Sequence, residues 1–208
     1  ALPIYVAGGA AGGAIPVHRF DASAYPAEAR HRAYQDLVAF AFRVTDPEPD
    51  FVALVDTYRL DRMVVHHSDV GAQTFDRSLE QIRRDGLSHF ALQAVISGEV
   101  DGDFGGRPIH TRDGEVFIAD LRRPFRMRTS RVKVVTLGIG RELLDPLGPA
   151  GTDLHGHVIR GAAGELLTEY LRVMAERLPR LSAEALPGLT RATLSLIETC
   201  LTGVERAA

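Results

Sequence analysis

The sequence is poor in several residue types, and each scarcity excludes a class of protein. It has no tryptophan and one cysteine, and all but one of its 24 basic residues are arginines. The lone Cys200 rules out a disulfide framework and fits a reducing compartment, so we expect a cytoplasmic protein. No apolar run approaches the roughly 18 residues that a membrane-spanning helix needs, so we predict no membrane partner.

The charge balance argues against direct nucleic-acid binding. The formal net charge is −3 at pH 7. Nucleic-acid-binding domains usually carry a broad positive field, so we expect any DNA contact to come from another part of the protein. With 45% hydrophobic and 25% charged residues, the 208-residue chain has a globular composition rather than a disordered or collagen-like one.

The two ends of the chain differ in composition. Residues 1–19 are predicted to be a flexible arm, because alanine and glycine fill positions 7–14 in a spacing that does not match a dinucleotide-binding loop. The chain starts at Ala1 rather than at Met, so we expect a piece of a longer protein. At the other end, residues 151–208 form a predicted helical region. Two apolar stripes over 163–204 indicate an antiparallel helix pair, in which Pro187 either starts or bends the second helix.

Residues 20–150 are predicted to form a helical lead-in and a β-barrel or sandwich. Helical spacing of apolar residues covers 26–42, after which prolines interrupt the chain. Short extended segments punctuated by glycine-rich turns follow, at 62–68, 73–77, 79–83, 87–97, 115–121, 125–129 and 131–139. The connections are too short for crossover helices, which excludes a parallel doubly wound sheet.

Catalytic chemistry finds no support in the residue spacing. The eight histidines lack a recognisable metal-ligand pattern, so we predict neither a metal nor another cofactor. There is no Gly-x-Ser-x-Gly elbow, Cys200 falls on an apolar helical stripe, and the paired carboxylates fall in turns. We therefore predict no catalytic residue. A run of six cations over 122–133 indicates a solvated or domain-contacting face, with an anion site as the alternative.

Three stretches carry a family resemblance through their order and spacing. They are a strand ending in glycine at 86–98, a turn and strand at 112–120 followed by Pro124 and Phe125, and the segment 154–159 that leads into the paired helices. Together they resemble the N-terminal sensing region of AraC-type transcription regulators, over about residues 20–204. Arg112 and Asp113 stand where that family usually has proline before Gly114, and Glu115 replaces a common aspartate.

The resemblance implies an α+β, mainly β fold: a cupin-like barrel of the double-stranded β-helix type, preceded by a short helical segment and followed by an antiparallel helix pair. It also implies a homodimer that senses a small-molecule effector. The parent protein would bind operator DNA through a C-terminal helix-turn-helix domain that this chain lacks. A cupin-fold metal-dependent enzyme is the alternative, although the paired histidines and glutamate of such enzymes are absent. A solidly packed dimerisation module is a third reading.

Strand parity gives four candidate ligand-binding residues. On segment 87–97, apolar residues at 90, 92, 94 and 96 share one face, whereas His89 and Gln93 share the other. Phe125 and Met127 share a face of a later strand. If the barrel encloses a cavity, His89 and Gln93 are its predicted polar anchors and Phe125 and Met127 its apolar wall. The alternative is that all four are core or surface residues.

Overall fold

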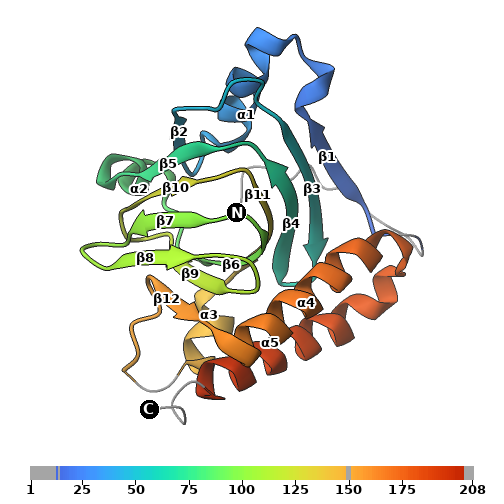
Figure 1. Ribbon diagram of the computed structural model, residues 1–208. Coiled ribbons are helices and arrows are strands. Elements are labelled where there is room, and N and C mark those ends of the chain that lie inside the picture. Colours follow the sequence, from blue (N-terminus) through green and yellow to red (C-terminus); the bar gives the residue numbers. More distant parts are fainter. Residues whose placement is uncertain (1–12, 14, 149–150, 204–208) are drawn as a thin grey trace.

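A computed structural model describes residues 13, 15–148 and 151–203, and its β-strands form two antiparallel sheets that enclose a barrel (Figure 1). The larger sheet has the order β1 (Val17–Asp21), β3 (Ala53–Leu60), β4 (Met63–Val70), β11 (Val132–Ile139), β6 (Phe90–Ser97), β9 (Val116–Asp120) and β12 (His157–Ile159). The smaller sheet has the order β2 (Arg43–Thr45), β5 (Gln73–Arg77), β10 (Phe125–Thr129), β7 (Val100–Asp103) and β8 (Pro108–Thr111). This is the cupin-like architecture that the resemblance implied.

The seven-stranded sheet is covered on both faces, and its central strands therefore bury apolar side chains on both sides. Along β6, Ala91 and Val95 belong to the core inside the barrel, whereas Phe90, Leu92 and Ala94 belong to a second core on the outer face. The alternation predicted for this strand is therefore observed: successive side chains of β6 point to opposite faces of the sheet. The predicted apolar face turns away from the barrel interior.

Two long helices, α4 (Gly161–Arg177) and α5 (Leu186–Gly203), pack on the outer face of the seven-stranded sheet (Figure 1). The helix pair predicted over 163–204 is confirmed, and α5 begins next to Pro187, where a proline is tolerated. At Gly164, a Cβ atom would lie 2.6 Å from the carbonyl oxygen of Ile159. Glycine at this position therefore lets α4 approach the end of β12 closely.

The N-terminal segment closes one end of the barrel. Two short 3₁₀ turns, Ala22–Ala24 and Ala27–Ala29, lead into α1 (Arg30–Val38), which is shorter than the helix predicted over 26–42. Most of the arm predicted over 1–19 lies outside the described residues, but its last part pairs with β3 as strand β1.

The segment 79–83, predicted as extended, is helical instead, in α2 (Leu79–Asp85). The reason is local: the hydroxyl of Ser78 accepts a hydrogen bond from the backbone N–H of Gln81, and the Gln81 side chain accepts one from the backbone N–H of Ser78. Gly86, with φ of 63°, ends the helix in the left-handed conformation. The remaining helical turns are α3 (Arg141–Leu144), Asp145–Leu147, Leu178–Arg180 and Ala183–Ala185.

Candidate functional site

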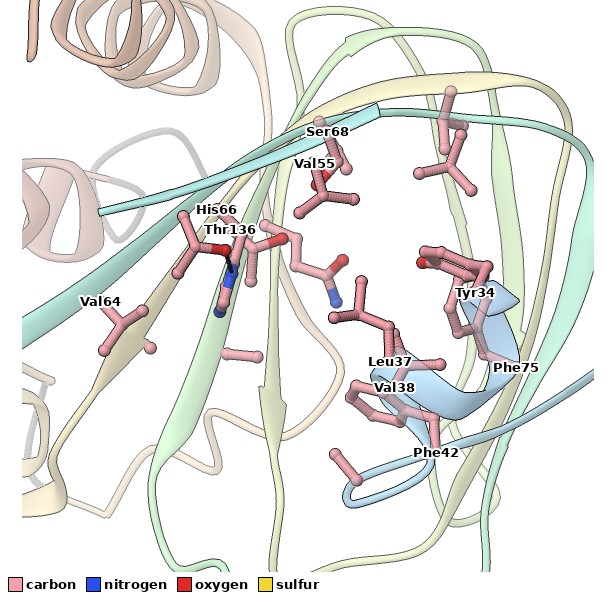
Figure 2. A pocket seen from close by; sticks show the side chains of 18 of the residues that line it. Tyr34, Leu37, Val38, Phe42, Val55, Val64, His66, Ser68, Phe75 and Thr136 are labelled. Carbon is pink, nitrogen blue, oxygen red and sulfur yellow. Dashed lines mark hydrogen bonds between the residues drawn. The ribbon is translucent and has the colours of Figure 1, made fainter. Parts of the chain in front are cut away.

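A cavity of about 320 Å³ lies inside the barrel. One wall comes from the inner faces of β3, β4, β11 and β6, and the other comes from β5, β10, α1 and the turn after α1. Figure 2 shows side chains from both walls pointing into this space. The volume is at the lower end of the range for small-molecule sites, so the cavity suits a small molecule rather than a peptide.

In-register pairing places four polar side chains side by side on the inner face of the seven-stranded sheet. Thr57 pairs with His66, His66 with Thr136, and Thr136 with Gln93, so the four residues cross the adjacent strands β3, β4, β11 and β6. All four line the cavity, and we call them the polar row. The Thr57 hydroxyl and Nδ1 of His66 share a hydrogen bond of 2.9 Å, drawn dashed in Figure 2.

The polar row lies between two mainly apolar rows. On one side, Val55, Ser68, Val134 and Val95 are in register across the same strands, with Ser68 as the single polar residue. On the other side, the lining residues in register are Val64, Gly138 and Ala91. The wall opposite the sheet is also mainly apolar, and it includes Tyr34, Leu37, Val38, Phe42 and Phe75 (Figure 2). The polar row thus gathers four hydrogen-bonding side chains on the sheet wall, whereas Ser68, His89, Tyr34 and Thr129 lie elsewhere in the lining.

Two histidines of the cavity, His66 and His89, are neutral at pH 7. His66 lies deep in the barrel, where burial lowers its pKa to about 4. Burial also lowers the pKa of His89, and the nearby guanidinium of Arg77 acts in the same direction. Because desolvation penalises the charged imidazolium, both rings offer one N–H donor and one nitrogen acceptor rather than a positive charge.

A buried arginine supports the wall around His89. The guanidinium of Arg77 is fully buried and donates two hydrogen bonds to the carboxylate of Asp85, at 2.8 and 3.0 Å. It also donates to the carbonyl oxygens of Ala41 and Leu121, both at 2.6 Å. Ala41 and Leu121 both line the cavity. Arg77 therefore fixes α2, the turn after α1 and the end of β9 against one another.

Three of the four predicted ligand-binding residues line the cavity together. His89 and Gln93 belong to the sheet wall, and Met127 belongs to the opposite wall on β10. Phe125 is buried but is not among the lining residues. Its ring stacks on Phe104 with ring centroids 4.9 Å apart and an interplanar angle of 6°, so it packs at the side of the barrel. Whether any of these residues binds a ligand stays a prediction.

Sequence reasoning missed His66, Thr57 and Thr136 as site residues. The segment 62–68 was recognised as a strand, but β3 was not, and the role of Thr57 depends on its pairing with β4. The polar row is a product of register between strands that are far apart in the sequence, and no local pattern specifies that register. The contribution of α1 to the cavity wall was also missed, because it depends on how the helix packs against the distant strands.

The cations over 122–133 do not gather into one anion site. Three of them form ion pairs with three separate carboxylates: Arg122 with Asp120, Arg123 with Asp153, and Arg131 with Asp69. Arg126 and Arg128 are exposed on β10, where they oppose Asp103 and Asp101 of the neighbouring strand β7. The run is therefore a charge-compensated surface, as the first of the two interpretations held.

Within the ranges that the structure describes, no group of three or more His, Cys, Asp or Glu side chains is arranged to hold a metal ion. The thiol of Cys200 is buried, and burial raises its pKa, so it is a poor nucleophile. No helix among the described residues has the length and apolar character needed to span a membrane.

A family model for the AraC-binding-like domain matches residues 28–202, which is most of the chain and includes every element of the cavity except β1. The chain belongs to the AraC-binding-like domain family. This match agrees with the resemblance seen in the sequence. It supports a ligand-sensing regulatory domain. Among curated proteins, none matches the sequence.

A solved structure of an AraC-like regulator shows the same fold. The crystal structure of the AraC-like transcriptional activator CuxR superimposes with a TM-score of 0.79 and 21% sequence identity, over 90% of this chain and 70% of CuxR. The Clostridium difficile EutQ protein aligns with a TM-score of 0.34 and 16% identity, over 46% of this chain and 75% of EutQ. KdgF from Halomonas sp. aligns with a TM-score of 0.33 and 14% identity, over 45% of this chain and 82% of KdgF. Of these, the CuxR alignment alone bears on the fold of this domain.

Proposed function

We propose that this chain is the effector-sensing and dimerisation domain of an AraC-type transcription regulator. The cavity takes up a small molecule, the domain pairs with a second copy of itself, and the parent protein binds operator DNA through a separate helix-turn-helix domain. The observation that carries the proposal is a cavity with its own polar row, inside a domain of this family. A sensing role rather than an enzymatic one is supported by the match to the AraC-binding-like domain family and by the fold shared with an AraC-like transcriptional activator. A cytoplasmic location is part of the same proposal.

Dimerisation is supported by the outer surface of α4. Leu166 and Val173 are 56% and 43% exposed there, although large apolar side chains are mostly buried elsewhere in the domain. They are seven residues apart, so they lie on one face of the helix two turns from each other. A second copy related by twofold symmetry would cover this face and would set the spacing of two DNA half-sites.

The sensing role is tested by filling the cavity. Val134 points into the cavity from β11, and Val134→Phe places an aromatic ring there. We expect this variant to lose binding of N-phenyl-1-naphthylamine, an uncharged aromatic probe whose fluorescence rises in apolar surroundings, by about tenfold or more. Titration of the probe into purified protein measures the effect.

The matched control is Val17→Phe, because Val17 is exposed on β1 and does not line the cavity. It should bind the probe as the unmodified chain does. In the parent regulator, Val134→Phe should also abolish the response of a reporter gene to its effector. Equal probe binding by the two variants would contradict the proposal.

A further inference from the structure

We propose that the cavity selects an uncharged molecule with an apolar body and one hydrogen-bonding end, such as a hydroxyl, carbonyl or amide group. The hydrogen-bonding end faces the polar row, and the apolar body packs against α1 and β5. The inference rests on the proposed sensing function and names the ligand class for the same site.

The first argument is the absence of free charge in the described lining. The single arginine among the described lining residues is Arg19, on the edge strand β1. It donates two hydrogen bonds of 2.6 Å to the carboxylate of Asp56. No aspartate, glutamate or lysine belongs to the described lining. A charged ligand would give up its hydration without meeting an opposite charge, and that loss is expensive inside a protein.

The second argument is the state of the histidines. His66 and His89 are the titratable groups of the sheet wall; the other titratable side chains that line the cavity are Tyr34 on α1 and His18 and Arg19 on β1. Both imidazoles of the sheet wall are neutral at pH 7 because burial lowers their pKa values. They can accept or donate a hydrogen bond, but they do not supply the cation that a carboxylate or phosphate ligand requires.

The third argument is that the polar row has hydrogen-bonding capacity to spare. Within the described residues, neither the hydroxyl of Thr136 nor the amide of Gln93 forms a hydrogen bond, although both lie inside the barrel. Polar groups in protein interiors are normally paired. The amide and the hydroxyl each donate and accept, so they suit an uncharged polar group of either kind.

The fourth argument is the distribution of polar and apolar lining. His66 and Thr136 lie on the sheet wall in Figure 2, whereas Leu37, Val38 and Phe42 lie across the cavity from them. One strip of hydrogen-bonding groups facing an apolar wall matches a molecule with one polar end. A sugar, with hydroxyl groups on all sides, would leave most of them unpaired against the apolar rows.

The test is a fragment library built as matched sets on common aromatic and aliphatic bodies. Each set has an amide, a carboxylate, an ammonium and an unsubstituted hydrocarbon member, with 4-methylbenzamide, 4-methylbenzoate, 4-methylbenzylamine and toluene as one example. Ligand-detected NMR and titration at pH 7.5 measure binding. We expect the amide members to bind about tenfold or more tightly than the carboxylate and ammonium members of the same sets.

Two substitutions locate the polar end. Thr136→Val and Gln93→Leu remove hydrogen-bonding groups of the polar row at nearly constant size, and each should weaken amide binding by about fivefold while leaving hydrocarbon binding unchanged or stronger. The matched control is Thr111→Val, because Thr111 is buried on β8 outside the cavity lining and its hydroxyl already donates to the carbonyl oxygen of Val100. It should leave amide binding unchanged.

The two proposals fail separately. Preferential binding of the carboxylate or ammonium members, or equal effects of Thr136→Val and Thr111→Val on amide binding, would overturn the ligand class while the cavity remains a binding site. Failure of every member and of N-phenyl-1-naphthylamine to bind the unmodified chain would overturn the sensing role itself, and the ligand class with it.

Discussion

At the scale of single residues, Arg77 is a side chain that joins distant parts of the domain. Its guanidinium satisfies one carboxylate and two carbonyl oxygens from three separate segments while being fully shielded from solvent. Removing one member of a buried ion pair leaves the other charge unpaired, and such substitutions are costly.

We expect Arg77→Met to lower the free energy of unfolding by about 3–5 kcal/mol, because Asp85 and the carbonyl oxygens of Ala41 and Leu121 lose their donor. Urea unfolding followed by circular dichroism measures the loss. Arg32→Met is the control, since Arg32 forms an exposed ion pair with Asp36 on α1 and should leave stability nearly unchanged. A similar loss in both variants would contradict the role assigned to Arg77.

The residue scale also shows what the sequence can specify. Alternation along 87–97 predicted correctly that His89 and Gln93 share a face, because side-chain direction in a strand follows directly from position. The same reasoning grouped Phe125 with Met127, yet only Met127 lines the cavity. Alternation along a strand predicts which side of the sheet a side chain faces, but not whether it reaches the cavity. Phe125 stacks on Phe104 instead of lining the cavity.

At the scale of elements, α4 packs on the barrel with one face and exposes apolar side chains on another. Its inner stripe is buried against the sheet, whereas Leu166 and Val173 remain exposed on another face. Apolar groups of this size lower the free energy when a second surface covers them.

We expect Leu166→Glu to shift the domain from dimer to monomer, because it places a charge at the centre of the proposed contact. Sedimentation velocity measures the shift. Leu79→Glu is the matched control: Leu79 is a leucine of nearly equal exposure, 54% against 56%, and it lies on α2, away from α4 in the sequence. Leu79→Glu should keep the dimer. A dimer that survives Leu166→Glu would show that another surface forms the contact.

The elements also mark the limit of prediction from local patterns. Long helices and well-punctuated strands were found, since α4, α5, β5 and β10 have clear periodicity and defined ends. The strands β1, β2, β3 and β12 were missed, and α2 was taken for a strand. Most of these elements are short, and all of them depend on caps or on pairing with distant segments.

At the scale of the whole molecule, buried histidines make the fold sensitive to acid. The pKa values of His31, His66, His89, His155 and His157 are all lowered, with burial as the main cause. The unfolded chain therefore binds more protons than the folded domain once the pH falls below about 6.5. The histidines therefore leave the free energy of unfolding unchanged above that pH and lower it progressively below it.

We expect the free energy of unfolding to fall steadily from pH 6.5 toward pH 4. His66 alone contributes up to about 3 kcal/mol of this fall, because its pKa is lowered from 6.5 to about 4. In His66→Asn, the stability curve should be flatter over this range, whatever its height at pH 7.5. Urea unfolding at a series of pH values measures both curves, and parallel curves would contradict the assignment. Carboxylates such as Asp153, whose pKa is lowered mainly by its hydrogen bond from Arg123, act only at still lower pH.

The double coverage of the seven-stranded sheet has a mechanical consequence. Gln93 and Leu92 are neighbours on one strand, yet Gln93 looks into the cavity and Leu92 is packed in the core beneath the helix pair. An effector that hydrogen-bonds to the Gln93 amide, as proposed, would therefore contact the same strand against which the helix pair packs. That one strand would connect the interior of the barrel to the outer helices directly.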